Sequence, residues 1–276
     1  MTKHRGKCAL ITGASQGLGR AIAEECARRG MDMVLVALSD TGLPEVARIL
    51  ERAFQVRIET VELDLTDPEV PGKLLSVIRE KHYEVDTLVN NAGVGFTSRF
   101  ADSSPWQNET TLQLNVAALV RLTQAMLPML RERERAWILN VASLGAFFPM
   151  PSMPVYSSTK GFVLTFSLLL REELRGSPVS LSVLCPNGIR TNRGSCDLIE
   201  RQGWAGQVTC QYPDEVARAG LRGLFRGRGV IVPGAVNAAL RLASPFVPRA
   251  LYMRMIARRW GTEKHRAALR PMEAKA

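Results

Sequence analysis

The chain alternates short, continuously apolar runs with longer segments of helical periodicity, and this alternation limits the folds that it can adopt. The first two runs are Cys8–Ile11 and Met33–Ala37. Strands without polar alternation are typical of parallel sheets that helices cover on both faces. The pattern therefore predicts an α/β fold, a doubly wound parallel sheet of about seven strands with right-handed crossovers. The remaining predicted strands are Ile58–Leu63, Asp86–Val89, Trp137–Val141, Val179–Leu184 and Val230–Val232.

Composition excludes several classes of protein. The 276 residues are 46% hydrophobic and 22% charged, which is typical of a globular chain and not of a disordered or collagen-like one. No apolar stretch approaches the roughly 20 residues of a membrane-spanning helix. The N-terminus runs into only four apolar residues, too few for a secretory signal, so we expect a cytoplasmic protein. The five cysteines form no CxxC pair, so we expect free thiols and no metal site.

The residues that follow each apolar run are the candidates for chemistry, because parallel α/β sheets bind ligands beyond the carboxyl ends of their strands. The first run leads into Thr12–Gly19, a TGxxxGxG loop that opens a helix. Glycines let the backbone approach a pyrophosphate, and a helix N-terminus adds free N–H groups and a positive dipole end. This context favours a dinucleotide site in a Rossmann fold over glycines that serve only a turn.

Polar residues also follow the fourth and fifth runs. Asn90–Gly93 reads Asn-Asn-Ala-Gly, and Ser143 comes just after the fifth predicted strand. Tyr156 and Lys160 follow at a spacing that places both side chains on one face of a helix. Alone, such a pair would usually be a surface contact, but its place after the other signals indicates a catalytic site.

These motifs together resemble the short-chain dehydrogenase/reductase family. The resemblance covers residues 5–235. The matching positions are TGxxxGxG at Thr12–Gly19, Asp64 after the third strand, NNAG at Asn90–Gly93, Asn115, Ser143, YxxxK at Tyr156–Lys160, and Pro-x-x-x-x-Thr from Pro186 to Thr191.

The resemblance implies a catalytic tetrad of Asn115, Ser143, Tyr156 and Lys160. Tyr156 would exchange a proton with the substrate oxygen, while Lys160 and an oxidised nicotinamide would lower the tyrosine pKa from its usual value near 10. Ser143 would hydrogen-bond the same oxygen and stabilise its developing charge. Asn115 is implied to hold a water that links Lys160 to solvent, and hydride would pass to or from the cofactor.

The end of the second strand indicates which dinucleotide binds. An NAD enzyme places an acid there, whereas this chain reads Val36-Ala37-Leu38-Ser39-Asp40. We therefore expect NADP, with NAD as the other possibility because Asp40 lies close. The cofactor contacts implied by the resemblance are Gly13, Ser15, Gln16, Gly17, Leu18, Gly19, Ser39, Asp64, Leu65, Asn91, Ala92, Gly93, Tyr156, Lys160, Pro186, Ile189 and Thr191.

The segment after the sixth predicted strand departs from the family pattern. The usual Pro-Gly is replaced by Pro186-Asn187-Gly188, and Asn tolerates the left-handed backbone that such a turn would need. Residues 192–212 are expected to form a mobile lid. Residues 144–155, rich in aromatic and Met side chains, either pack in the core or line a site for an apolar substrate.

Charge is concentrated at the C-terminus. Residues 1–215 hold 23 Lys and Arg against 24 Asp and Glu, whereas residues 216–276 hold 13 against 2. We expect a Rossmann-type catalytic domain over residues 1–235 and a basic, partly amphipathic helical extension of it over 236–276. Within the extension, Arg249–Trp260 could lie at a membrane interface, cover the substrate cleft or form a solvated helix. No nucleic-acid-binding motif accompanies the charge, so nucleic acid is not an expected partner.

The sequence thus predicts an NAD(P)-dependent oxidoreductase that interconverts a ketone and a secondary alcohol on a hydrophobic, lipid-like substrate. The alternative is a dinucleotide-binding regulatory or scaffold member of the same family without turnover. A homodimer or homotetramer is expected to form through two long predicted helices, Pro105–Leu130 and Val155–Arg175. The candidate contact residues, some of which must face the sheet instead, are Met126, Met129, Phe162, Phe166 and Leu169.

Overall fold

Seven parallel strands form a single sheet in the order β3-β2-β1-β4-β5-β6-β7. The computed structural model describes residues 7–151, 153–191, 207–248, 252–254 and 257. The predicted doubly wound sheet is confirmed, and each predicted strand agrees within one residue at either end. The strands are β1 Cys8–Thr12, β2 Asp32–Ala37, β3 Ile58–Glu62, β4 Val85–Asn90, β5 Ala136–Val141, β6 Val179–Leu184 and β7 Val230–Ile231.

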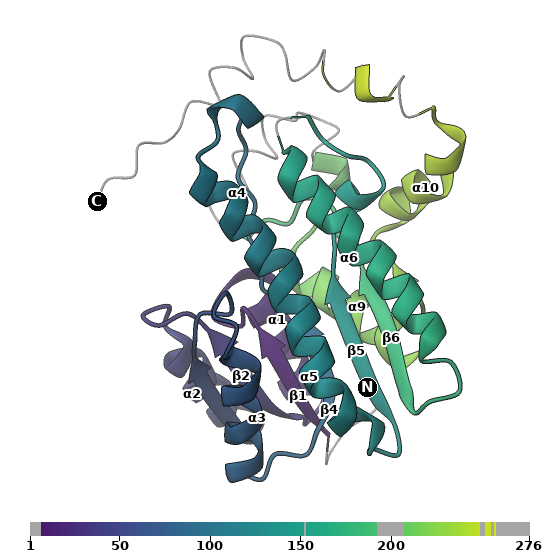
Figure 1. The fold of residues 1–276 in the computed structure, drawn as a ribbon. Coiled ribbons are helices and arrows are strands. Elements are labelled where there is room, and N and C mark those ends of the chain that lie inside the picture. Colours follow the sequence, from purple (N-terminus) through teal and green to yellow (C-terminus); the bar gives the residue numbers. More distant parts are fainter. Residues whose placement is uncertain (1–6, 152, 192–206, 249–251, 255–256, 258–276) are drawn as a thin grey trace.

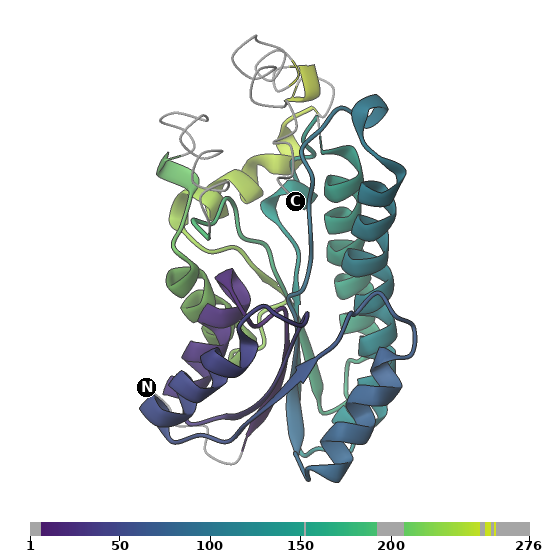
Figure 2. The ribbon, with the colours of Figure 1, turned by 90° about the vertical axis from the view of Figure 1, so that its left-hand side faces the viewer.

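Helices cover both faces of the sheet (Figure 2). One layer contains α1 (Gly17–Arg28), α2 (Leu43–Phe54) and α9 (Pro213–Phe225); the other contains α3 (Val70–Glu80), α5 (Leu119–Arg131) and α6 (Pro154–Glu173). The strands read as continuous apolar runs because they feed two cores. In β1, for example, Leu10 packs toward the core that includes α3 and α5, while Ile11 packs toward the one that includes α1 and α9.

The carboxyl ends of β1 and β4 meet where the strand order reverses. The Thr12 hydroxyl lies between them and donates to the carbonyl oxygen of Val89 at 3.3 Å. The Thr12 hydroxyl oxygen in turn accepts from the backbone N–H groups of Asn91 and Ala92, each at 3.0 Å. One buried side chain therefore fixes the loop that follows β4 against the end of β1.

The long helix predicted over 105–130 is divided by a π-helical turn. It consists of α4 (Pro105–Leu112), the π turn Gln113–Ala118 and α5, and Ser104 with Gln107 forms a capping box at its start (Figure 1). Met126, a candidate for an intersubunit contact, is fully buried in the core, so that assignment is wrong. Its position on α5 turns it toward the sheet.

The C-terminal part of the described chain continues from β7 into α10 (Ala235–Ala243) and a 3₁₀ turn at Ser244–Phe246. Most of the predicted lid over residues 192–212, and most of the predicted helix Arg249–Trp260, lie outside the described residues. Within the part of the chain that the structure describes, no helix is both long enough and apolar enough to span a membrane.

Candidate active site

The loop between β1 and α1 forms a tight cradle of glycines. A Cβ atom on Gly19 would lie 2.0 Å from the carbonyl oxygen of Gly13, so no side chain fits there. Gly13 and Gly17 have φ values of 66° and 55°, in the left-handed region that glycine adopts without strain. Gln16 caps α1 without a side-chain hydrogen bond, which leaves the first N–H groups of the helix available to an anion.

A cleft of about 560 Å³ lies over this cradle, within the size range of cofactor sites. Twelve of the residues predicted to contact a dinucleotide line this cleft, so the structure brings these twelve together in space. The residues present fit a dinucleotide, because glycine backbone and unpaired helix N–H groups face an open cleft. The twelve are Gly13, Ser15, Gln16, Gly17, Leu18, Gly19, Asp64, Leu65, Asn91, Ala92, Gly93 and Thr191.

Other cleft residues were missed from the sequence. They come from the ends of β2 and β3 and from the helix that begins at Pro105, and no local motif marks them. These residues are Ala37, Leu38, Thr41, Leu63, Thr66, Trp106, Thr110 and Leu114.

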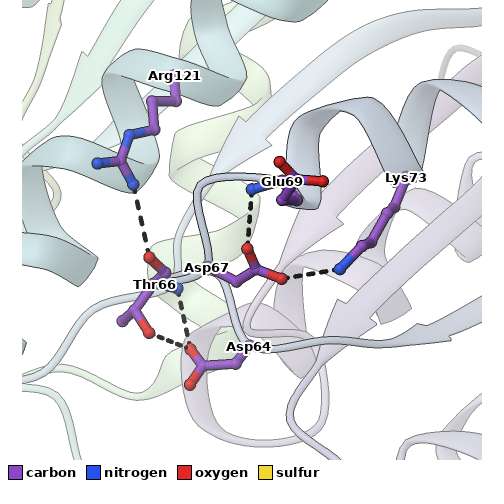
Figure 3. Close-up of polar contacts among 6 residues, drawn as sticks. All are labelled: Asp64, Thr66, Asp67, Glu69, Lys73 and Arg121. Carbon is purple, nitrogen blue, oxygen red and sulfur yellow. Dashed lines mark hydrogen bonds and ion pairs between the residues drawn. The ribbon is translucent and has the colours of Figure 1, made fainter.

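The turn after β3 holds Asp64 in place at the edge of the cleft (Figure 3). The backbone N–H and the hydroxyl of Thr66 donate to Asp64 Oδ1 at 2.9 and 2.8 Å. Lys73 of α3 donates to Asp67 at 2.8 Å, and the Arg121 guanidinium of α5 donates to the Thr66 carbonyl oxygen at 3.5 Å. Neighbouring helices thus brace the turn that presents Asp64.

Five predicted cofactor residues do not line the cleft: Tyr156 and Lys160 of the predicted tetrad, and Ser39, Pro186 and Ile189. Ser39 is exposed, although its neighbours Leu38 and Thr41 do line it. Pro186 and Ile189 lie in the segment after β6, which joins the loop after β5 because the Pro186 carbonyl oxygen accepts from the Leu144 N–H at 2.7 Å. Asn187 is not among the residues with positive φ, so this turn forms without the left-handed backbone that the sequence suggested.

Asn115 lies in the π turn and is 1% exposed. Its Oδ1 accepts from the N–H of Val94 at 2.8 Å, and its Nδ2 donates to the Val94 carbonyl oxygen at 2.8 Å and to the Thr159 hydroxyl at 3.1 Å. The side chain therefore ties the loop after β4 to α6, next to Lys160. Both Nδ2 hydrogens are used in these contacts.

Lys160 is buried and points at the carboxyl end of β5. Its ammonium group donates to the Val141 carbonyl oxygen at 2.9 Å. A Cβ atom on Gly93 would lie 3.3 Å from Lys160 Nζ and 2.9 Å from Asn115 Oδ1, so these groups converge on the last residue of the NNAG motif. Burial lowers the pKa of Lys160 to about 8.

Tyr156 lies beside Ser143, whose hydroxyl forms a hydrogen bond with it. Burial raises the pKa of Tyr156, and the bond from Ser143 opposes that rise in part. The Lys160 Nζ atom lies 5.8 Å from the centre of the Tyr156 ring. In the chain by itself the phenol therefore stays protonated at neutral pH, and the lowering of its pKa by Lys160 together with an oxidised nicotinamide stays a prediction.

The Tyr156 ring packs on backbone that only glycine allows. A Cβ atom on Gly95 would lie 2.5 Å from Tyr156 Cδ2, so Gly95 is a site residue that the sequence motifs did not mark. A second, much smaller cavity of about 10 Å³ touches Tyr156, and its lining combines apolar side chains such as Phe96, Phe100 and Met153 with polar ones such as Ser98 and Asn108. The segment over residues 144–155 is therefore divided, since Leu144 is in the core while Met153 and Val155 line this cavity.

The family model for short chain dehydrogenases matches residues 7–196. The chain belongs to this family. The match includes the glycine cradle, the NNAG stretch and all four residues of the predicted tetrad, so the resemblance inferred from the motifs is confirmed.

Similar proteins include one curated relative and two solved structures. Very-long-chain 3-oxoacyl-CoA reductase-A of Danio rerio is 33% identical over 67% of this chain and 59% of its own length. A short-chain dehydrogenase from Sphingobium yanoikuyae, in complex with NADPH, is 32% identical with a TM-score of 0.75 over 89% of this chain and 94% of that one. A family member from Burkholderia phymatum, in complex with NAD, is 26% identical with a TM-score of 0.78 over 88% and 94%.

The chain therefore matches less than two thirds of the curated relative's length. The two structures hold NADPH and NAD respectively, and the predicted cofactor, NADP with NAD as the other possibility, is consistent with both.

We predict that Gly19→Ala weakens dinucleotide binding by tenfold or more, about 1.4 kcal/mol. The added methyl group would meet Gly13 backbone, which cannot turn aside as a flexible side chain would. Gly72→Ala on α3 is the matched control, because nothing lies within 4 Å of its Cβ position. Titration of protein fluorescence with NADPH measures both, and equal affinity of the two variants would contradict the cradle.

We predict that the burial of Lys160 is visible in the pH dependence of stability. Between pH 8 and its ordinary pKa of 10.5, the unfolded chain keeps a proton that the folded chain releases. The penalty for the buried charge is thus fully present below pH 8 and is relieved as pH rises. The free energy of unfolding, relative to Lys160→Met, should rise by up to about 3 kcal/mol across this window. Urea unfolding measures it, and parallel pH curves for the two proteins would contradict the prediction.

Proposed function

We propose that this protein is an NAD(P)-dependent oxidoreductase that interconverts a ketone and a secondary alcohol on a hydrophobic substrate. One observation carries the proposal: the hydrogen-bonded pair of Ser143 and Tyr156 lies near buried Lys160, whose Nζ atom is 5.8 Å from the centre of the Tyr156 ring. Gly93, which lines the glycine-rich cleft, lies against Lys160 and Asn115. A proton-transfer group is thereby placed near a cleft with room for a dinucleotide.

The glycine cradle and the N-terminus of α1 would hold the pyrophosphate of the cofactor. Asp64 and Leu65 would border the adenine, and the segment from Pro186 to Thr191 would border the nicotinamide. When bound, the nicotinamide supplies or accepts a hydride. NADP is the proposed preference, because Ala37, Leu38 and Thr41 line the cleft at the end of β2 whereas Asp40 does not. A 2′-phosphate there would meet no carboxylate from this turn.

In carbonyl reduction, Tyr156 would give its proton to the substrate oxygen while Ser143 donates a hydrogen bond to the same oxygen. The raised pKa of Tyr156 favours this direction, because the phenol keeps its proton until the oxygen becomes basic. Lys160 would return a proton toward Tyr156, since its pKa of about 8 lies close to the working pH. Asn115 would act as a positioning residue for Lys160 through Thr159 and the loop at Val94.

A lipid-like ketone is the proposed substrate class. Phe96, Phe100 and Met153 lie near Tyr156, and none of the residues around this small cavity is charged, which favours an apolar ligand over a charged sugar. The name of the relative from Danio rerio, a very-long-chain 3-oxoacyl-CoA reductase, supports the same class. The competing function is dinucleotide binding without turnover, and the presence of all four tetrad residues argues against it.

The proposed localisation is cytoplasmic, with peripheral contact to a membrane through the extension over residues 236–276. The extension also contacts the substrate side, because the ring centroids of Tyr252 and Phe148 are 5.2 Å apart.

We predict that Tyr156→Phe lowers kcat by at least about a hundredfold, the usual contribution of a proton-transfer group. Affinity for NADPH should stay nearly unchanged, because only the hydroxyl is removed. Oxidation of NADPH with a panel of apolar ketones measures the rate. Turnover by the wild type supports the enzyme over the scaffold, and an unchanged rate in the variant would refute the mechanism.

We propose that two copies pair through α6. Phe162 and Leu169 are 42% and 62% exposed on one face of this helix, and Phe162 stacks on Phe166 at 5.8 Å. We predict that Phe162→Asp with Leu169→Asp weakens self-association by at least about a hundredfold, since pairing would bury unpaired charge. Light scattering at micromolar concentration measures this, with Ile49→Asp on α2 as the control. A wild type that is strictly monomeric would remove the proposal.

A further inference from the structure

Helix α10 is amphipathic, but its polar side faces the protein and its apolar side faces outward. Its polar residues Asn237 and Arg241, one turn apart, face the protein, and Asn237 is 2% exposed. The outward positions of α10 and of the following turn are apolar. We call this surface the α10 face; its large residues are Val236, Leu240, Leu242 and Phe246, which are 45%, 39%, 65% and 85% exposed.

The inward polar residues are held by specific contacts. Asn237 Nδ2 donates to the carbonyl oxygens of Thr209 and Pro233 at 2.9 and 3.2 Å, and its Oδ1 accepts from Asn187 at 3.2 Å. The Arg241 guanidinium lies over the Phe147 ring, 5.8 Å from its centre. Because rotation of the helix would break these contacts, the α10 face stays turned outward.

The position of α10 relates this face to the candidate site. The helix follows β7 at the carboxyl edge of the sheet, where it lies at the periphery of the molecule (Figure 1). Its contacts reach the segments after β5 and β6, through Phe147 and Asn187 respectively. Four large, exposed apolar residues within one short helix and its following turn favour an interaction surface over scattered surface variation.

Charge identifies the partner. Residues 241–276 hold nine Lys and Arg against two Asp and Glu, and Arg254 within this segment is exposed. A second copy seated on the α10 face would bring an equally basic segment against this one, and like charges repel. An anionic bilayer accepts apolar side chains and attracts basic ones, and these two signals together give stable peripheral binding.

We propose that the α10 face docks into an anionic membrane surface and holds the mouth of the candidate site at the interface between lipid and water. The inference deepens the proposed function, because it names the membrane surface as the source of the hydrophobic substrate. The docking itself requires no turnover.

The test is co-sedimentation of the full chain with vesicles of equimolar phosphatidylserine and phosphatidylcholine at low salt. The double variant Leu242→Ser with Phe246→Ser removes apolar surface and leaves net charge unchanged. It should lower partitioning by at least about tenfold, given what burial of each of these side chains contributes. Ile49→Ser, at a 43% exposed position on α2, is the matched control and should bind as the wild type does.

Pure phosphatidylcholine vesicles should bind the wild type more weakly, and added salt should release it from the anionic ones. Three results would overturn the proposal: a wild type that ignores anionic vesicles, a double variant that binds them equally well, or a double variant that only changes the oligomeric state. NADPH oxidation with a small, water-soluble ketone separates the two proposals. Vesicle binding without turnover refutes the activity alone, and turnover without vesicle binding refutes the docking alone.

Discussion

The hydroxyl of Thr12 joins the two halves of the sheet at the point where its strand order reverses. It lies between the ends of β1 and β4, and the backbone of Asn91 and Ala92 depends on it for two hydrogen bonds. Asn91 in turn donates from Nδ2 to the carbonyl oxygen of Thr12 at 2.9 Å. Ligands of doubly wound sheets bind at this reversal, so the same contacts that close the fold also shape the floor of the cofactor cleft.

A second set of buried polar contacts connects β4 and β5 to α6, the helix that holds two of the tetrad residues. Asn90 donates to Asn140 Oδ1 at 2.8 Å, and Asn140 donates to the Ser167 hydroxyl of α6 at 3.0 Å. A buried amide that loses its partner costs more than a lost exposed bond, so each member holds the others in register. The helix that presents Tyr156 and Lys160 is thus fixed to β4 and β5 by polar contacts as well as by its apolar face.

Much of this could be predicted from the sequence, for a physical reason. Buried parallel strands must be continuously apolar, and glycines, amides and the Tyr–Lys pair must follow them at the ligand edge, so order along the chain predicts convergence in space. Properties that depend on rotation about a helix axis were harder to predict from the sequence. Met126 was a candidate for the contact surface, but it is buried. Which side of α5 faces the sheet depends on rotation about the helix axis, and the π turn changes that rotation.

Side-chain environment was also beyond the sequence. Ser39 was assigned to the cleft because it follows β2, but the turn directs Leu38 and Thr41 there instead. Lys160 and an oxidised nicotinamide were expected to lower the pKa of Tyr156 together, whereas in the chain alone burial raises it. Spacing gives the proximity of two groups, whereas the balance of desolvation and charge depends on everything packed around them.

The π turn at Gln113–Ala118 allows one long helical segment to contact two different parts of the molecule. An extra residue within a turn shifts everything after it by about 100° around the helix axis. Before the shift, Trp106 and Thr110 face the dinucleotide cleft; after it, Leu122, Met126 and Leu130 face the sheet. A regular helix of the same sequence could satisfy only one of these partners, so the irregular turn lets a single segment act both as a wall of the cleft and as part of the core.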